Sequence, residues 1–201
     1  MASTSTKVTA GEIEAALFRK YDGQQSHWIV LREVTIDDEV LLEELVAAQE
    51  RMPAWAKSES QKRYYASRRS AAPTKRRIDM LLVSHKNSES VKIKRERIAL
   101  EIKVSRSDFL SETDEKRGPW RRFADKFAYV APAGMIKPEE LPPGCGLMEY
   151  GLDQWGFHTL VWKVRAKAEP NPNRGLEPNF AHYILSRLHT AEAKLRRLAA
   201  A

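Results

Sequence analysis

The chain has 201 residues, a formal net charge of +7 and 42% hydrophobic residues. That length can bury one sizeable core, so we expect a single domain over residues 1–201. Cys145 is the only cysteine, which excludes an intramolecular disulfide and favours a cytoplasmic setting. No stretch approaches the roughly 20 apolar residues of a membrane span, and we expect no membrane partner.

The N-terminal third is expected to form a helix, a strand and a second helix. The first helix should begin near Thr9 and end near Tyr21, because apolar residues recur on one arc of it. Glu14 falls inside that arc, where it is either a functional acid with a partner or a first-turn residue pointing to water. The first strand is expected at 27–35 and the second helix at 37–51.

Positive charge is concentrated in residues 57–77. This segment has eight basic residues and one acid and so carries a charge of +7, whereas the rest of the chain has 26 basic and 26 acidic residues. Cations interleaved with aromatic residues suit phosphate contacts and stacking on bases, although a solvated helix or loop would carry the same charges. The predicted nucleic-acid contacts are Lys62, Arg63, Tyr64, Tyr65, Arg68, Arg69, Lys75, Arg76 and Arg77.

Charged residues interrupt the two apolar runs that follow. Asp79 lies in the predicted strand 77–83, and Glu101 and Lys103 lie in the predicted strand 97–105. Side chains two residues apart on a strand point to the same face, so Glu101 and Lys103 should lie together. If the two strands pair, Asp79 lies close to Glu101 and Lys103. Such a set can bind a hard metal ion and activate water, or it can be a buried structural ion network.

The second half of the chain continues the α/β pattern. The apolar stripe of a final helix would pack on its own domain, with a homodimer through it as the alternative. In chain order the predicted elements are a short helix from Ser107, a break at Gly118-Pro119 with another helical turn after it, a strand at 126–130, a hairpin of 147–150 with 157–164, a linker at 167–178 and the helix at about 179–199.

An acid on one strand and Glu-x-Lys on its neighbour resemble the signature of the PD-(D/E)XK nuclease superfamily, here Asp79 and residues 101–103. Ile78 stands where the family name has Pro. The string Leu-Glu-Ile-Lys-Val-Ser-Arg-Ser-Asp-Phe-Leu at 100–110 is similar, more particularly, to the MmcB-like DNA repair proteins and their phage relatives. The resemblance implies a restriction-endonuclease-like core at about 10–132, with a mixed four-stranded sheet flanked by helices. A basic insertion at about 53–76 and a C-terminal hairpin plus helix at about 133–201 would elaborate it.

The resemblance also implies a function, that of a metal-dependent DNA endonuclease or nuclease-like repair protein in a bacterial or phage-infected cell. Asp79, Glu101 and the carbonyl of Ile102 would hold Mg²⁺ or Mn²⁺, and Glu14 would complete the shell. Lys103 would orient or help to deprotonate the attacking water and stabilise charge on the phosphate.

The implied partner is DNA, whether duplex, branched or single-stranded. From their positions alone, Ser105 would continue the strand face of Glu101 and Lys103 and orient substrate or water, and Lys126 would open its strand where a second cation meets a phosphate, so both are auxiliary contacts. Two alternatives are a protein with the same fold that binds DNA or RNA with weak or lost catalysis, and a non-enzymatic RNA-binding or assembly protein that relies on residues 57–77.

Overall fold

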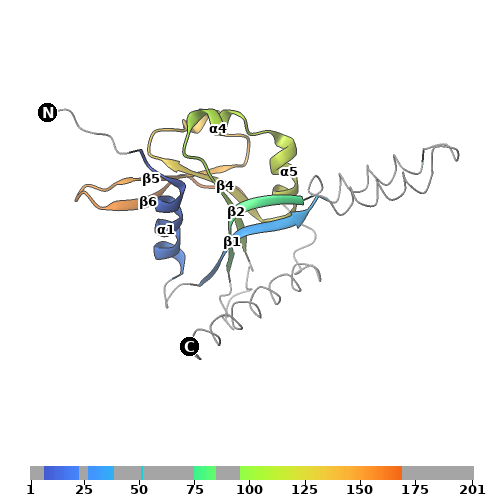
Figure 1. Cartoon of the computed structure of the whole chain (residues 1–201), viewed down its shortest axis with the longest axis horizontal. Helices are drawn as coiled ribbons and strands as arrows, with labels where there is room; N and C mark the ends of the chain where they lie inside the picture. Colours follow the sequence, from blue (N-terminus) through green and yellow to red (C-terminus); the bar gives the residue numbers. More distant parts are fainter. Residues whose placement is uncertain (1–6, 23–26, 39–50, 52–74, 85–95, 169–201) are drawn as a thin grey trace, which may run out of the picture. The chain divides into compact units, whose positions relative to one another are not determined.

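Figure 1 shows the computed structural model of the chain. The structure describes residues 7–22, 27–38, 51, 75–84 and 96–168, all of which belong to one compact unit. The predicted contacts from Lys62 to Arg69 lie outside the described residues, as do most of the helix at 37–51 and of the linker, and the whole of the final helix with its proposed dimer contact.

A six-stranded mixed sheet in the order β1-β2-β3-β4-β5-β6 forms the centre of this unit. Strands β3, β4 and β5 are parallel to one another, whereas β1, β2 and β6 run antiparallel to their neighbours. The sheet has six strands rather than the expected four, because the predicted C-terminal hairpin pairs with β4 and so extends the same sheet. The strands are β1 (Trp28–Asp37), β2 (Lys75–Ser84), β3 (Arg97–Ile102), β4 (Lys126–Pro132), β5 (Gly146–Leu152) and β6 (His158–Val164).

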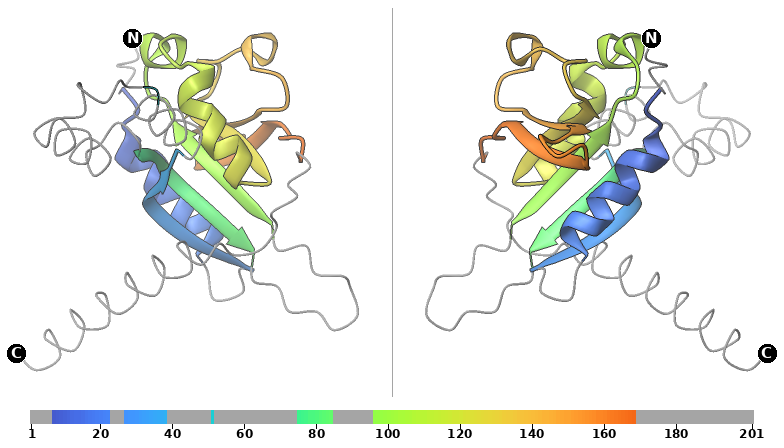
Figure 2. Two further views of the ribbon diagram at one scale, coloured as in Figure 1. Left: turned by 90° about the vertical axis from the view of Figure 1, so that its right-hand side faces the viewer. Right: turned by 90° about the vertical axis from the view of Figure 1, so that its left-hand side faces the viewer.

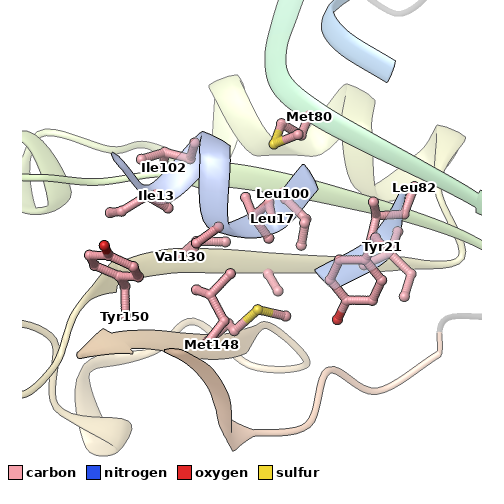
Figure 3. Close-up of a cluster of buried hydrophobic side chains, with 14 of the residues drawn as sticks. Ile13, Leu17, Tyr21, Met80, Leu82, Leu100, Ile102, Val130, Met148 and Tyr150 are labelled. Carbon is pink, nitrogen blue, oxygen red and sulfur yellow. The ribbon is translucent and has the colours of Figure 1, made fainter. Parts of the chain in front are cut away.

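Helix α1 (Ala10–Tyr21) covers one face of the sheet, as the apolar arc predicted. Thr9 begins it with a capping box, in which the Glu12 N–H donates to the Thr9 hydroxyl over 3.3 Å and the Thr9 N–H donates to the Glu12 carboxylate over 2.7 Å. Its buried side chains pack on alternate residues of the central strands (Figure 3), including Met80, Leu82, Leu100, Ile102, Val130 and Met148. Residues between these positions on the regular strands face the opposite side.

Helices α4 (Arg106–Leu110) and α5 (Asp114–Phe123) connect β3 to β4, and α5 covers the face opposite α1 (Figure 2). The predicted break at Gly118-Pro119 is wrong, because both residues lie inside α5. Pro119 lacks only the hydrogen bond to the Glu115 carbonyl, and the buried Trp120 ring packs edge-on against Phe123 at 5.7 Å. A short 3₁₀ helix, η3 (Pro138–Glu140), follows β4. No described helix is long and apolar enough to cross a membrane.

Candidate active site

Asp79 lies where the regular pairing of β1 with β2 is interrupted. Glu33, which falls opposite it, has φ +46°, and the ladder resumes on both sides. Met80 packs under α1, whereas Ile78, two residues away on the same strand, lines a cleft beside α5. The two faces of β2 are therefore exchanged near Asp79, and the β2 ribbon bends next to Met80 (Figure 3). At this bend the Asp79 carboxylate reaches β3 and accepts the Ile102 N–H over 2.8 Å.

Glu101 and Lys103 lie together on the face opposite α1, as predicted. Glu101 is the register partner of Tyr129, whose ring packs against Phe109 of α4 at 5.2 Å. The Lys103 N–H donates to the Val130 carbonyl over 2.9 Å, which keeps this residue beside β4 after β3 has ended. The Lys103 Nζ then lies 3.2 Å from Glu101 Oε1.

Two further acids, which the sequence did not identify as site residues, hold the Lys103 ammonium. Its Nζ lies 2.8 Å from Glu112 Oε2 and 3.4 Å from Asp108 Oδ1. The Lys103 and Glu112 side chains are only 5% and 7% exposed, so this contact is buried. Asp108 lies in the first turn of α4, and Glu112 lies in the turn between α4 and α5. The signal that could have found them is the need of a buried lysine for more than one counter-charge.

Burial and neighbouring charges alter the proton affinity of these groups. Burial, with the charge of Asp79, raises the pKa of Glu101 to about 7, although Lys103 opposes the shift. Burial also raises the pKa of Asp79. For Lys103, burial acts to lower the pKa, but the hydrogen bond that its ammonium donates to Glu112 and the charges of Glu101 and Glu112 raise it above its usual value. Lys103 is therefore a protonated, fixed cation at neutral pH.

A cleft of about 330 Å³ opens beside Glu101 and Lys103 on the α5 side. Its walls include Lys75, Arg76 and Arg77, the first three residues of β2. Lys75 and Arg76, which were expected in the basic insertion, therefore belong to the sheet. Arg76 also forms ion pairs of 3.2 Å with Asp38 and 3.0 Å with Glu115. The lining residues are Lys75, Arg76, Arg77, Ile78, Glu101, Lys103, Asp108, Glu112, Lys116, Trp120 and Phe127.

The remaining predicted site residues lie in three different places. Glu14 has a partner, because it forms an ion pair with Arg32 of β1, and its charge contributes to the raised pKa of Asp79. Ser105 does not continue the strand: its hydroxyl caps α4 by accepting the Asp108 N–H over 3.2 Å. Lys126 is level with the start of β3, at the far end from Glu101, and lies 2.5 Å from Glu96. The structure therefore does not bring Lys126 to this site.

Whether a divalent cation can bind at this site depends on which ligand atoms the residues offer. Within the described ranges, no group of three or more His, Cys, Asp or Glu side chains is gathered as a metal site. The charge of Asp79 nevertheless raises the Glu101 pKa, and the Asp79 carboxylate binds the N–H of Ile102, the residue next to Glu101. Two carboxylates that repel one another, next to the Ile102 backbone, offer the oxygen ligands that Mg²⁺ and Mn²⁺ prefer. The residues fit such an ion.

Comparison with known proteins leaves the family open. No protein family and no curated protein matches the sequence. One solved structure, a protein of unknown function from Silicibacter pomeroyi, is similar over 61% of this chain and 68% of its own, with 20% sequence identity and a TM-score of 0.39. A likeness of this degree identifies neither a family nor a function.

Proposed function

We propose that the protein is a metal-dependent deoxyribonuclease of the PD-(D/E)XK type, which hydrolyses phosphodiester bonds in DNA. The observation that supports it most is that Asp79 of β2 lies near Glu101 and Lys103 at the end of β3, beside a cleft with basic walls. An ion set of this kind costs desolvation energy and gives no dependable gain in stability, so its presence beside a cleft favours a functional role.

Each residue then has a chemical role. Asp79, Glu101 and the Ile102 carbonyl would hold Mg²⁺ or Mn²⁺, an ion that supplies Lewis acidity and lowers the pKa of bound water. Lys103 would place a fixed positive charge beside the phosphate and, being protonated, would orient water rather than deprotonate it. Lys75, Arg76 and Arg77 would contact neighbouring phosphates from the cleft wall. Glu14 would act through the charge it places near Asp79.

Cleavage of labelled duplex, branched and single-stranded DNA with Mn²⁺ or Mg²⁺, and in EDTA, tests this proposal. Asp79→Asn, Glu101→Gln and Lys103→Met should each abolish cleavage, and the first two should also lose Mn²⁺ binding by calorimetry. Glu139→Gln, on an exposed residue of η3, is the matched control and should leave both unchanged. Cleavage in EDTA as fast as with metal would contradict the mechanism.

A second candidate is a nucleic-acid-binding protein in which catalysis is weak or lost. The observation that favours it is the enclosure of the Lys103 ammonium by three carboxylates, which leaves little of its charge for a phosphate. This candidate requires tight binding without cleavage in Mn²⁺. Competition between duplex DNA, branched DNA and RNA would then identify the preferred ligand and would separate an RNA-binding protein from a DNA-binding one.

A further inference from the structure

The hairpin formed by β5 and β6 exposes an unusual amount of apolar surface. Among the described residues, six large apolar side chains are more than 40% exposed, and four of them lie on this hairpin. Single exposed apolar residues are ordinary, but two exposed aromatic rings in one turn mark an interaction surface. The four are Leu152 at 65%, Trp155 at 72%, Phe157 at 70% and Val161 at 56%.

The turn at the end of the hairpin holds two aromatic residues in place. One carboxylate oxygen of Asp153 accepts the N–H groups of Trp155 and Phe157, each over 2.9 Å. The Asp153 N–H donates to the Phe157 carbonyl over 2.8 Å, and Gly156 supplies the positive φ, +82°, that closes the turn. Both rings are therefore presented to solvent by an ordered backbone, which lowers the entropy cost of binding a ligand.

The direction of the strands places this turn at the same edge of the sheet as the candidate active site. Ile102, Val130 and Met148 are register partners on the parallel strands β3, β4 and β5. The tip follows Leu152, which lies four residues, or about 13 Å, beyond Met148 along β5. Across the sheet, β5 is two strand spacings, or about 10 Å, from β3. Figure 1 shows the orange tip projecting past α1. One nucleic-acid strand can span that separation.

The outer strand of the hairpin and the residues after it are basic. Lys163, Arg165 and Lys167 are exposed, and the Arg165 guanidinium lies 5.4 Å from the centre of the Trp162 ring. The two acids of the hairpin point to backbone groups instead: Asp153 binds its own turn, and Glu149 accepts the Gly134 N–H over 2.9 Å. The exposed charge of this strand is therefore complementary to a polyanion.

We propose that the β5–β6 hairpin is a binding surface for single-stranded nucleic acid. Unpaired bases stack on Trp155 and Phe157, and the phosphates run along β6 past Lys163, Arg165 and Lys167. A single strand fits better than a duplex because both faces of its bases are open to aromatic stacking, which is how non-specific single-strand sites bind. This surface binds the same class of ligand as the proposed nuclease site. It uses different residues, and its binding does not require a metal ion.

The test is binding of a fluorescent thymidine oligomer of about 15 nucleotides in EDTA, followed by fluorescence anisotropy. The double variant Trp155→Ser/Phe157→Ser should bind at least about fivefold more weakly, the lower bound for one lost stacking contact. Trp155→Tyr/Phe157→Tyr should restore most of the affinity. Ile29→Ser, an exposed apolar residue on the opposite edge strand β1, is the matched control and should bind as the wild type does.

A salt series separates the cations from the rings. Lys163→Gln/Arg165→Gln/Lys167→Gln should flatten the dependence of log K on log salt by up to about 2, since each phosphate contact on a single strand contributes about 0.7. The aromatic variant should keep the wild-type slope. Because the assay contains EDTA, its result does not depend on cleavage, so failure of the nuclease proposal and failure of this one are told apart.

One result would overturn the inference, namely equal affinity of the wild type and the Trp155→Ser/Phe157→Ser variant for the oligomer. In that case the same variant is tested for loss of binding to vesicles of anionic phospholipid and for loss of self-association in sedimentation. Either loss would assign the hairpin to a lipid surface or to a second copy of the chain.

Discussion

Removing the charge of Glu112 should show how the Lys103 ammonium is held. A charged hydrogen bond such as the 2.8 Å contact between them contributes about 1.5–3 kcal/mol. Glu112→Gln retains the shape and a hydrogen-bonding oxygen, and Glu101 and Asp108 remain as counter-charges. We therefore expect a loss of about 1.5–2 kcal/mol in the free energy of unfolding, at the lower end of that range.

Lys103→Met should cost more, about 3–5 kcal/mol, because it leaves the nearly buried Glu112 carboxylate without its cation. The double variant Lys103→Met/Glu112→Gln should then cost less than the sum of the single variants by about 1–3 kcal/mol, the coupling expected of residues in contact. Urea unfolding in EDTA, followed by tryptophan fluorescence, measures all four proteins, and Glu139→Gln should fall within about 0.5 kcal/mol of the wild type. Strict additivity of the two changes would refute the buried ion pair.

Three further predictions concern protons, metal and packing. The folded-state pKa of Glu101 is raised to about 7, so between about pH 4.5 and 7 the unfolded chain binds fewer protons than the folded one. The free energy of unfolding in EDTA should therefore fall as the pH rises through that window. Glu101→Gln should make this fall smaller. Mn²⁺ at about 100 times its Kd should raise the free energy of unfolding of the wild type by about 2.7 kcal/mol, as measured by thermal scans, and should not raise that of Asp79→Asn. Ca²⁺ should bind at the same site but support little DNA cleavage. Gly146→Ala should lower the free energy of unfolding by about 1–3 kcal/mol, because the added Cβ would lie 2.8 Å from the Ala166 nitrogen. Gly11→Ala, in helix α1, meets no atom within 4 Å and should leave that free energy unchanged or raise it by up to about 1 kcal/mol, measured by urea unfolding.

Local patterns in the sequence predicted most of the described helices and strands, and they placed the central charges of the candidate site on two of the strands. Strand alternation correctly placed Glu101 and Lys103 on one face, and the helical arc correctly placed Ile13 and Leu17 in the core. Glu112 was missed because it comes from a turn between two helices, and no periodic pattern reports which side chain a turn brings to a buried lysine. The six-stranded sheet was missed for a related reason, since pairing of β5 with β4 is a contact between distant segments.

The position of Asp79 depends on a feature that strand alternation does not contain. A regular strand would place it on the face of Leu81, and its carboxylate would project from the sheet surface. The positive φ of Glu33 interrupts the β1–β2 ladder opposite Asp79, and the exchange of faces between Ile78 and Met80 follows there. This irregularity lets the Asp79 carboxylate turn along the sheet to the Ile102 N–H, next to the residue that carries the second acid. Because backbone strain of this kind costs about 1–3 kcal/mol and clusters at functional sites, its position beside the three charged residues is a further reason to assign them a function.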